Sequence, residues 1–211
     1  MSLRNLLDTP EIDLGDPSRF SVRSAMAAYT KPVIGISRDG ILNQFRSDHV
    51  KVPGEFAPIE NALKAVALMR NKGHRIIIFA SQWGISEGKM TPVDVDLVNQ
   101  HMLNLLGEAG CMSIDGIYYS TSKQKDDIYA FPNVGMFQRA EREAKVKFSE
   151  GWFIGNTIPE LKAAQNIKAK SVFIKTGQSE ETEKKLNSYA NQDLKRRVQT
   201  FNTLMEFAES L

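Results

Sequence analysis

The sequence predicts a doubly wound α/β fold, in which a parallel β-sheet carries helices on both faces. Short, β-prone apolar runs recur along the chain, and the segments between them place apolar residues every three to four positions. Because each strand-helix-strand succession makes a right-handed crossover, its repetition builds a parallel sheet. The predicted strands are 33–37, 75–80, 117–119, 152–154 and 171–174.

The first β-α-β unit occupies residues 33–80. Its opening strand is an apolar run that ends in a polar tip, which is typical of a buried strand that delivers side chains to the edge of a sheet. Residues 59–70 have apolar side chains at helical spacing, and Gly73 suits the end of that helix. The β-branched run 75–80 then predicts the second strand.

The clearest local signal is a helix start at Thr91. Thr91 suits the N-cap, Pro92 suits the first helical position, and Asp94 completes a capping-box-like pair. Apolar residues then recur at helical spacing over 95–109, and Gly110 closes the helix. Further helices are predicted over 135–147, 159–166, 180–190 and 202–211.

The composition is typical of a soluble globular protein. The 211 residues are 42% hydrophobic and 25% charged, and the formal charge of +2 is too small to indicate a nucleic-acid partner by itself. The only cysteine, Cys111, excludes an intrachain disulfide and a cysteine zinc site. No apolar run approaches the roughly 18 residues that cross a bilayer. We therefore expect a cytoplasmic protein with no membrane contact.

The chain divides into an N-terminal extension, residues 1–31, and one domain, residues 32–211. The extension is rich in Asp, Ser, Pro and Thr and has no sustained helical or strand period. Its scattered apolar residues are suited to docking, so we expect the extension to be one of two candidate contacts with a protein partner.

Three loops that follow predicted strands carry polar side chains. Ser37 and Asp39 leave the first strand, Ser81 and Gln82 follow the second, and Asn156 follows the strand at 152–154. The carboxyl ends of parallel strands meet at one edge of a sheet. The sequence therefore predicts a site at this edge.

Four short motifs resemble those of the haloacid dehalogenase (HAD) phosphatases, in particular the branch of heptose bisphosphate and histidinol phosphatases. The matching segments are 33–41 (Asp-x-Asp-Gly in the family), 78–85 (Thr-Asn-Gln-Ser-Gly-Ile), 132–136 (Lys-Pro-x-x-Gly-Met) and 153–156 (Val-Gly-Asp). The strand at 115–119 is similar to the one that precedes the zinc loop of that branch. The resemblance covers roughly residues 32–211 and implies a HAD-like, Rossmannoid sheet without a large cap domain.

The chemical positions depart from the pattern that this resemblance implies. In the family the first acid of the opening motif attacks phosphorus and the second moves a proton; here Ser37 replaces the first acid and Asp39 retains the second. The fourth-motif acid that binds magnesium in the family is replaced by Asn156, and Glu160 is the nearest acid. Catalytic candidates are therefore Asp39 and Ser37, and the candidate metal ligands Asn156 and Glu160 suit Mg²⁺ poorly.

The substrate-binding positions are altered as well. Ala80 replaces the second-motif hydroxyl, although Ser81, Gln82 and Gly84 remain in the loop that would hold phosphate. Asn133 aligns with the third-motif lysine. The residues that align with the zinc ligands of the branch are Ser120, Ser122, Asp127 and Tyr129. These are not a zinc tetrad, so no zinc is expected.

The main hypothesis is a pseudoenzyme: a HAD-fold phosphatase homologue that has lost its activity and acts as a binding or structural protein, with no cofactor expected. The alternative is a divergent magnesium-dependent phosphomonoesterase that acts on a sugar phosphate or a polynucleotide 3′-phosphate. In that alternative Asp39 activates water, and Glu160 with Asn156 holds the metal.

Trp83 is the second candidate contact with a protein partner. It stands in the phosphate loop where the family has a small residue, so its indole either fills part of the pocket or anchors a partner. A nucleic-acid partner ranks last because the chain is close to neutral.

Overall fold

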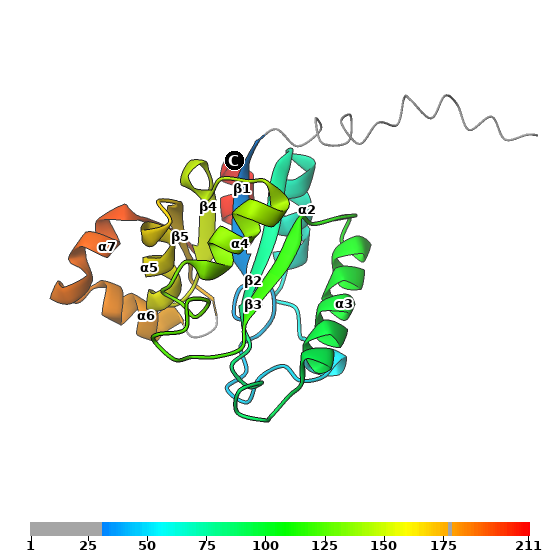
Figure 1. Cartoon of the computed structure of the whole chain (residues 1–211). Helices are drawn as coiled ribbons and strands as arrows, with labels where there is room; N and C mark the ends of the chain where they lie inside the picture. The colour runs from blue at the N-terminus through cyan, green and yellow to red at the C-terminus, as the bar shows by residue number, and fades with distance from the viewer. Residues whose placement is uncertain (1–30, 177–178) are drawn as a thin grey trace, which may run out of the picture.

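A parallel sheet of six strands forms the centre of the structure (Figure 1). The structure is a computed structural model that describes residues 31–176 and 179–211. The strands are β1 (Lys31–Ser37), β2 (His74–Ser81), β3 (Gly116–Ser120), β4 (Trp152–Gly155), β5 (Lys170–Ile174) and β6 (Val198–Phe201). Their spatial order is β3-β2-β1-β4-β5-β6, and every neighbouring pair is parallel, which confirms the predicted doubly wound fold.

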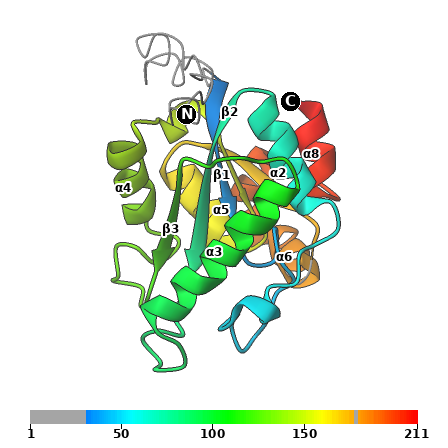
Figure 2. The same ribbon diagram turned by 90° about the vertical axis from the view of Figure 1, so that its right-hand side faces the viewer.

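Helices cover both faces of this sheet (Figure 2). One face packs against α2 (Ala62–Asn71), α3 (Pro92–Glu108) and α8 (Leu204–Ser210). The other packs against α4 (Gly135–Ala144) and α5 (Ile158–Asn166), and α6 (Ser179–Leu186) and α7 (Gln192–Arg197) pack beside β5. Short 3₁₀ turns lie at Pro53–Glu55, Phe148–Glu150 and Tyr189–Asn191.

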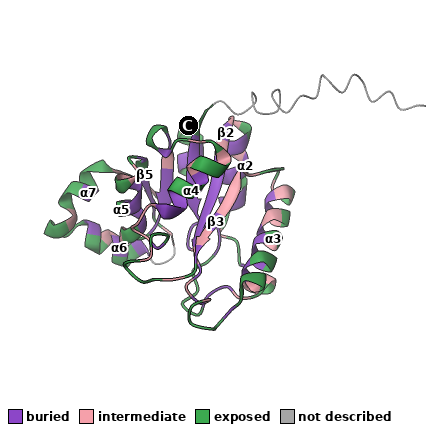
Figure 3. Cartoon of the chain, viewed as in Figure 1, coloured by how far each residue is buried: buried purple, intermediate pink, exposed green. Residues whose placement is uncertain are grey.

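From Val33 onward, the central strand β1 is buried on both sides (Figure 3). Ile34 and Ile36 point toward the α2 side, as the period of two along a strand requires. Gly35 points to the other side, where an added Cβ would lie 2.9 Å from ring atoms of Phe148 and Phe153. A glycine is needed here because aromatic rings fill the space that a side chain would occupy.

Phe79 of β2 is the centre of that aromatic cluster. Its ring centroid lies 4.6 Å from that of Phe137 and 5.6 Å from those of Phe148 and Phe153. Edge-to-face and tilted aromatic pairs of this kind contribute about 0.5–1.5 kcal/mol each beyond the buried area. The cluster fixes α4 and the 3₁₀ turn at Phe148 against the sheet.

The helix start at Thr91 is confirmed. The Asp94 amide donates to the Thr91 hydroxyl, and Asp94 Oδ2 accepts from the Thr91 amide at 2.7 Å, so both halves of a capping box are formed. The predicted helix at 180–190 is shorter, because α6 ends at Leu186.

Two C-terminal elements, β6 and α7, were not predicted. Val198–Phe201 is an edge strand with polar residues at its centre and no buried residue, so its sequence lacks an apolar run. Of the predicted N-terminal extension, only Lys31 lies within the described residues, where it opens β1. None of the helices in the described ranges is long and apolar enough to cross a membrane.

Candidate functional site

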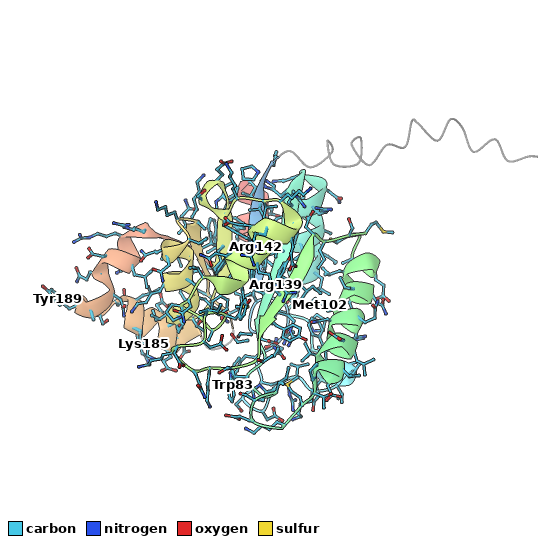
Figure 4. All side chains as sticks on the ribbon, viewed as in Figure 1. Trp83, Met102, Arg139, Arg142, Lys185 and Tyr189 are labelled. Atoms are coloured by element: carbon cyan, nitrogen blue, oxygen red, sulfur yellow. The ribbon has the colours of Figure 1, made fainter. Side chains whose placement is uncertain are left out.

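A cavity of about 450 Å³ lies at the carboxyl edge of the sheet, among the loops that follow β1, β2 and β4. Strands β1 and β4 are neighbours, but the chain leaves them toward opposite sides of the sheet, which is the arrangement where doubly wound folds bind ligands. The cavity brings together six of the predicted site residues: Ser37, Asp39, Ser81, Gln82, Asn156 and Glu160. Figure 4 shows Trp83, which also lines the cavity, beyond the tips of β2 and β3.

Ser37 and Glu160 form a hydrogen-bonded pair at the floor of this cavity. The Ser37 hydroxyl donates to Glu160 Oε1, and both residues are buried. Glu160 Oε2 accepts the backbone amides of Asn156 and Thr157, each at 3.0 Å, because Glu160 lies in the first turn of α5. Both carboxyl oxygens are therefore already engaged by donors from this chain.

Burial raises the pKa of the Glu160 carboxyl, and its hydrogen bonds from Ser37 and from the two amides oppose that shift only in part. The neutral carboxyl is thus favoured relative to an exposed glutamate. Sequence reasoning identified Glu160 as the nearest acid to Asn156 but missed its contact with Ser37, which depends on the pairing of β1 with β4.

Asp39 is held by three side chains. Arg38 Nη2 lies 3.0 Å from Asp39 Oδ2, Asn43 Nδ2 donates to Oδ1 at 3.1 Å, and Gln82 Nε2 donates to Oδ2 at 2.9 Å. These hydrogen bonds fix the position of the Asp39 carboxyl, and Arg38 places a positive charge beside it. The position that resembles the proton shuttle of the family is thus the counter-ion of a buried arginine.

Arg38 is a residue that the sequence analysis missed. Its side chain is fully buried and its Nη1 donates to Asn99 Oδ1 of α3 at 2.9 Å, so it joins β1 to α3. A buried guanidinium must be paired to be tolerated, and Asp39 supplies the charge. The only signal in the sequence was the position of Arg38 immediately before an acid at the end of a buried strand.

Asn156 closes the loop after β4 onto the loop after β1. Its Nδ2 donates to the Gly40 carbonyl at 3.0 Å, and Thr176 donates to the same oxygen. Gly40 has a φ of +81°, and a Cβ there would lie 2.2 Å from Asn156 Nδ2. The amide at position 156 therefore acts as a hydrogen-bond donor at the point where a metal-binding acid would act as an acceptor.

The mouth of the cavity is formed by Trp83 and charged side chains. The Trp83 ring makes an edge contact with His49, at 4.2 Å between centroids, and Lys123 Nζ lies 4.2 Å from its centroid. Glu87 forms salt bridges with Lys123 and Lys89, and these hydrogen bonds lower the pKa of Glu87 to about 2. Burial lowers the pKa of His49, so its imidazole is neutral near pH 7.

Two predicted substrate-binding residues lie outside the cavity lining. Asn133 donates to the carbonyls of Lys125 and Asp127, at 2.9 and 2.8 Å, and so shapes its own loop. Gly84 is packed against His49, where a Cβ would lie 2.8 Å from the imidazole. These contacts do not place the Asn133 amide in the cavity, so they give no support to its predicted role in substrate binding. Gly84 leaves room for the His49 ring.

The residues of this cavity do not fit Mg²⁺. Magnesium prefers carboxylate oxygens, whereas Asp39 is occupied by three donors and Glu160 is biased toward its neutral form. Ser37 and Asn156 are neutral and already bonded to Glu160 and Gly40. Within residues 31–176 and 179–211, no group of three or more His, Cys, Asp or Glu side chains is arranged to hold a metal ion.

Comparison with known proteins supports the resemblance seen in the motifs. The sequence matches no protein-family model. It is 28% identical over 178 residues to the D-glycero-β-D-manno-heptose-1,7-bisphosphate 7-phosphatase of Neisseria meningitidis, a match that covers 84% of this chain and 92% of the relative. It is 29% identical over 163 residues to the corresponding phosphatase of Chlorobaculum tepidum, covering 71% of this chain and 81% of the relative.

Solved structures show the same fold. The D,D-heptose 1,7-bisphosphate phosphatase of B. bronchiseptica, crystallised with magnesium and phosphate, superposes with a TM-score of 0.76 at 21% identity and covers 86% of this chain and 97% of that one. The enzyme of Burkholderia thailandensis gives a TM-score of 0.62 at 19% identity, over 85% and 97% of the two chains. The fold predicted from the motifs is therefore confirmed.

Proposed function

We propose that this chain, a homologue of the heptose bisphosphate phosphatases with the HAD-like fold, binds a phosphomonoester in the cavity between β1, β2 and β4. The observation that carries the proposal is the convergence of Ser37, Ser81 and Asn156 on one cavity at the junction of β1 and β4. The volume of about 450 Å³ lies within the roughly 300–1,000 Å³ range of small-molecule sites.

The charges of the cavity are compatible with a phosphate group. The negative charge of Asp39 is balanced by Arg38, and burial favours the neutral form of Glu160, so the floor does not repel an anion strongly. Arg46 and Lys123 also line the cavity. Both are partly exposed and form surface ion pairs, which cost only about 0–1 kcal/mol to exchange for a phosphate.

Hydrolysis of the bound ester is the second candidate function, and the relatives favour it because they are named as phosphatases. The chemistry of the floor disfavours the magnesium-dependent form of that activity. A metal-free form would use the Ser37 hydroxyl as the attacking group and the ionised form of Glu160 as the acceptor of its proton; that proton would pass to the departing alcohol, and water would then hydrolyse the phosphoserine. Because Ser37 stands where the resembling family has a carboxylate nucleophile, we propose binding without turnover first.

One set of measurements separates these possibilities. Calorimetry in EDTA would titrate the wild-type protein with inorganic phosphate and with glucose 6-phosphate. The same titrations would be made with an Arg46→Met/Lys123→Met variant, which removes two cations from the cavity. An Arg139→Met/Lys185→Met variant, which removes exposed cations outside the cavity, is the control. We expect binding by the wild type and the control and weaker binding by the cavity variant. Equal binding by all three proteins, or by none, contradicts the proposal.

A phosphatase screen of the same wild-type protein tests turnover. We expect no magnesium-stimulated release of phosphate, and we expect partial recovery of release in a Ser37→Asp/Asn156→Asp variant. Magnesium-dependent turnover by the wild type that is abolished by Asp39→Asn would instead establish the divergent phosphatase. Metal-free turnover that is abolished by Ser37→Ala would establish the route through Ser37 and Glu160.

A further inference from the structure

The apolar surface at the mouth of the cavity indicates the kind of molecule that carries the phosphate. Phe45, Trp83 and Phe131 all line the cavity together with the buried Val50. Phe45 is 41% exposed, which is unusual for a phenylalanine and leaves much of its ring without a protein neighbour. An apolar wall of this size is suited to a flat or apolar group rather than to water.

The amide nitrogens of Gln82 and Asn156 already donate to groups of the protein, whereas Gln82 Oε1 is buried without a hydrogen-bond partner among the described residues. Gln82 Nε2 donates to Asp39 and to the Ser81 carbonyl, and Asn156 Nδ2 donates to Gly40. A sugar presents several hydroxyls, and each must replace its hydrogen bonds with water by bonds to the site. Gln82 Nε2 has both of its hydrogens in use, so it would have to leave Asp39 or the Ser81 carbonyl before it could donate to a sugar.

Trp83 is held as a fixed platform. The His49 ring contacts its indole edge-on at 4.2 Å between centroids, and His49 is in turn packed against Gly84, whose missing side chain makes the room. Lys123 covers the indole with its ammonium 4.2 Å from the ring centroid, but its side chain is 61% exposed and is held otherwise by a surface pair with Glu87. A phosphate in the cavity would attract Lys123 away from the indole and leave that ring free to stack.

From these contacts we propose that the phosphomonoester bound here carries an aromatic ring, as in an aryl phosphate or a nucleoside monophosphate, and that Trp83 and Phe45 contact this ring. The inference rests on the proposed phosphoester-binding function and specifies its ligand class. It differs from the sugar bisphosphate in the names of the relatives. Stacking of a base on an aromatic side chain contributes about 1–3 kcal/mol, which corresponds to roughly 5- to 150-fold in affinity.

The test is calorimetry of the full chain in EDTA with four probes: phenyl phosphate, adenosine 5′-monophosphate, glucose 6-phosphate and inorganic phosphate. We expect one or both aromatic esters to bind at least about fivefold more tightly than glucose 6-phosphate. Trp83→Leu should remove this preference, so that the ratio of the affinity for the aromatic esters to the affinity for glucose 6-phosphate falls to about one. Tyr189→Leu is the matched control, because Tyr189 is 93% exposed and lies far from Trp83 (Figure 4).

The outcomes separate this inference from the proposed function. If glucose 6-phosphate binds as tightly as the aromatic esters, or if Trp83→Leu leaves their preference intact, the inference is overturned while the phosphoester-binding function stands. If no ester and no inorganic phosphate binds, both are overturned. Phe45→Leu provides an independent variant, and circular dichroism of each variant shows whether it is folded.

Discussion

The Ser37 hydroxyl donates a hydrogen bond to the Glu160 carboxyl, across the junction of β1 and β4 and over 123 positions of sequence. This contact joins the end of the central strand to the first turn of α5. It also places a serine hydroxyl at the position where the resembling phosphatases would have a carboxylate nucleophile. The following expectations test what this arrangement does for stability and for metal binding.

The buried Glu160 makes stability depend on pH. Because the pKa of Glu160 is higher in the folded than in the unfolded protein, its contribution is fully present below the unfolded pKa and is lost as pH rises through the folded pKa. Between these two pKa values we expect the unfolding free energy to fall by about 1.4 kcal/mol per pH unit relative to Glu160→Gln. Urea unfolding of both proteins from acid to neutral pH measures this, and parallel pH profiles would contradict it.

Arg38 should be essential to the fold. We expect Arg38→Met to destabilise the protein by about 3–5 kcal/mol, because it leaves Asp39 without its charge partner beside the buried Asn99. The exposed pair of Arg139 and Glu143 offers a control, and Arg139→Met should change stability by no more than about 0.5 kcal/mol. Chemical denaturation gives both values; similar losses would mean that burial does not determine the cost.

Gly40 should tolerate a methyl group much less well than Gly88. Both have positive φ, at +81° and +68°, but the added Cβ meets Asn156 at Gly40 and meets nothing within 4 Å at Gly88. We expect Gly88→Ala to cost about 1 kcal/mol for its backbone conformation, and Gly40→Ala to cost a further 1–3 kcal/mol or so for the overlap. Equal urea midpoints for Gly40→Ala and Gly88→Ala would contradict this expectation, because they would show that Asn156 moves away from position 40 at little cost.

Magnesium should leave the wild-type protein unchanged. We expect no shift of the thermal midpoint between EDTA and about 10 mM Mg²⁺, whereas Ser37→Asp/Asn156→Asp should gain about 1.4 kcal/mol if its dissociation constant is near 1 mM. Differential scanning calorimetry of both proteins provides the measurement, with Ca²⁺ as a comparison ion. Stabilisation of the wild type by Mg²⁺ would show that the floor of the cavity rearranges to bind it.

The sequence was informative where short-range patterns determine structure. The apolar run before Ser37 predicted β1, and the Thr91–Asp94 capping box predicted the start of α3, because each depends on neighbours in the chain. The edge strand β6 has no such pattern, since its residues pair on one side only, its two central residues are exposed and its two end residues are only partly buried. It could be identified only from its pairing with β5.

The candidate site could be predicted only in part from the sequence. The loops after β1, β2 and β4 could be brought to one edge from the parallel topology alone. The bond between Ser37 and Glu160 and the burial of Arg38 could not, because they depend on side-chain directions across the sheet and toward α3. Asn133 was assigned to the site by alignment, but its amide bonds turn it toward its own loop.

The bond between Asn156 and Gly40 also constrains how this protein could evolve. An acid at position 156 would turn its oxygen toward the Gly40 carbonyl, which is itself an acceptor, and an acid at position 37 would face Glu160. Each single substitution toward the motif of the resembling phosphatases thus adds an uncompensated negative charge to a buried position. A change to a metal-binding site of that kind would therefore pass through a less stable intermediate, whichever of the two substitutions came first.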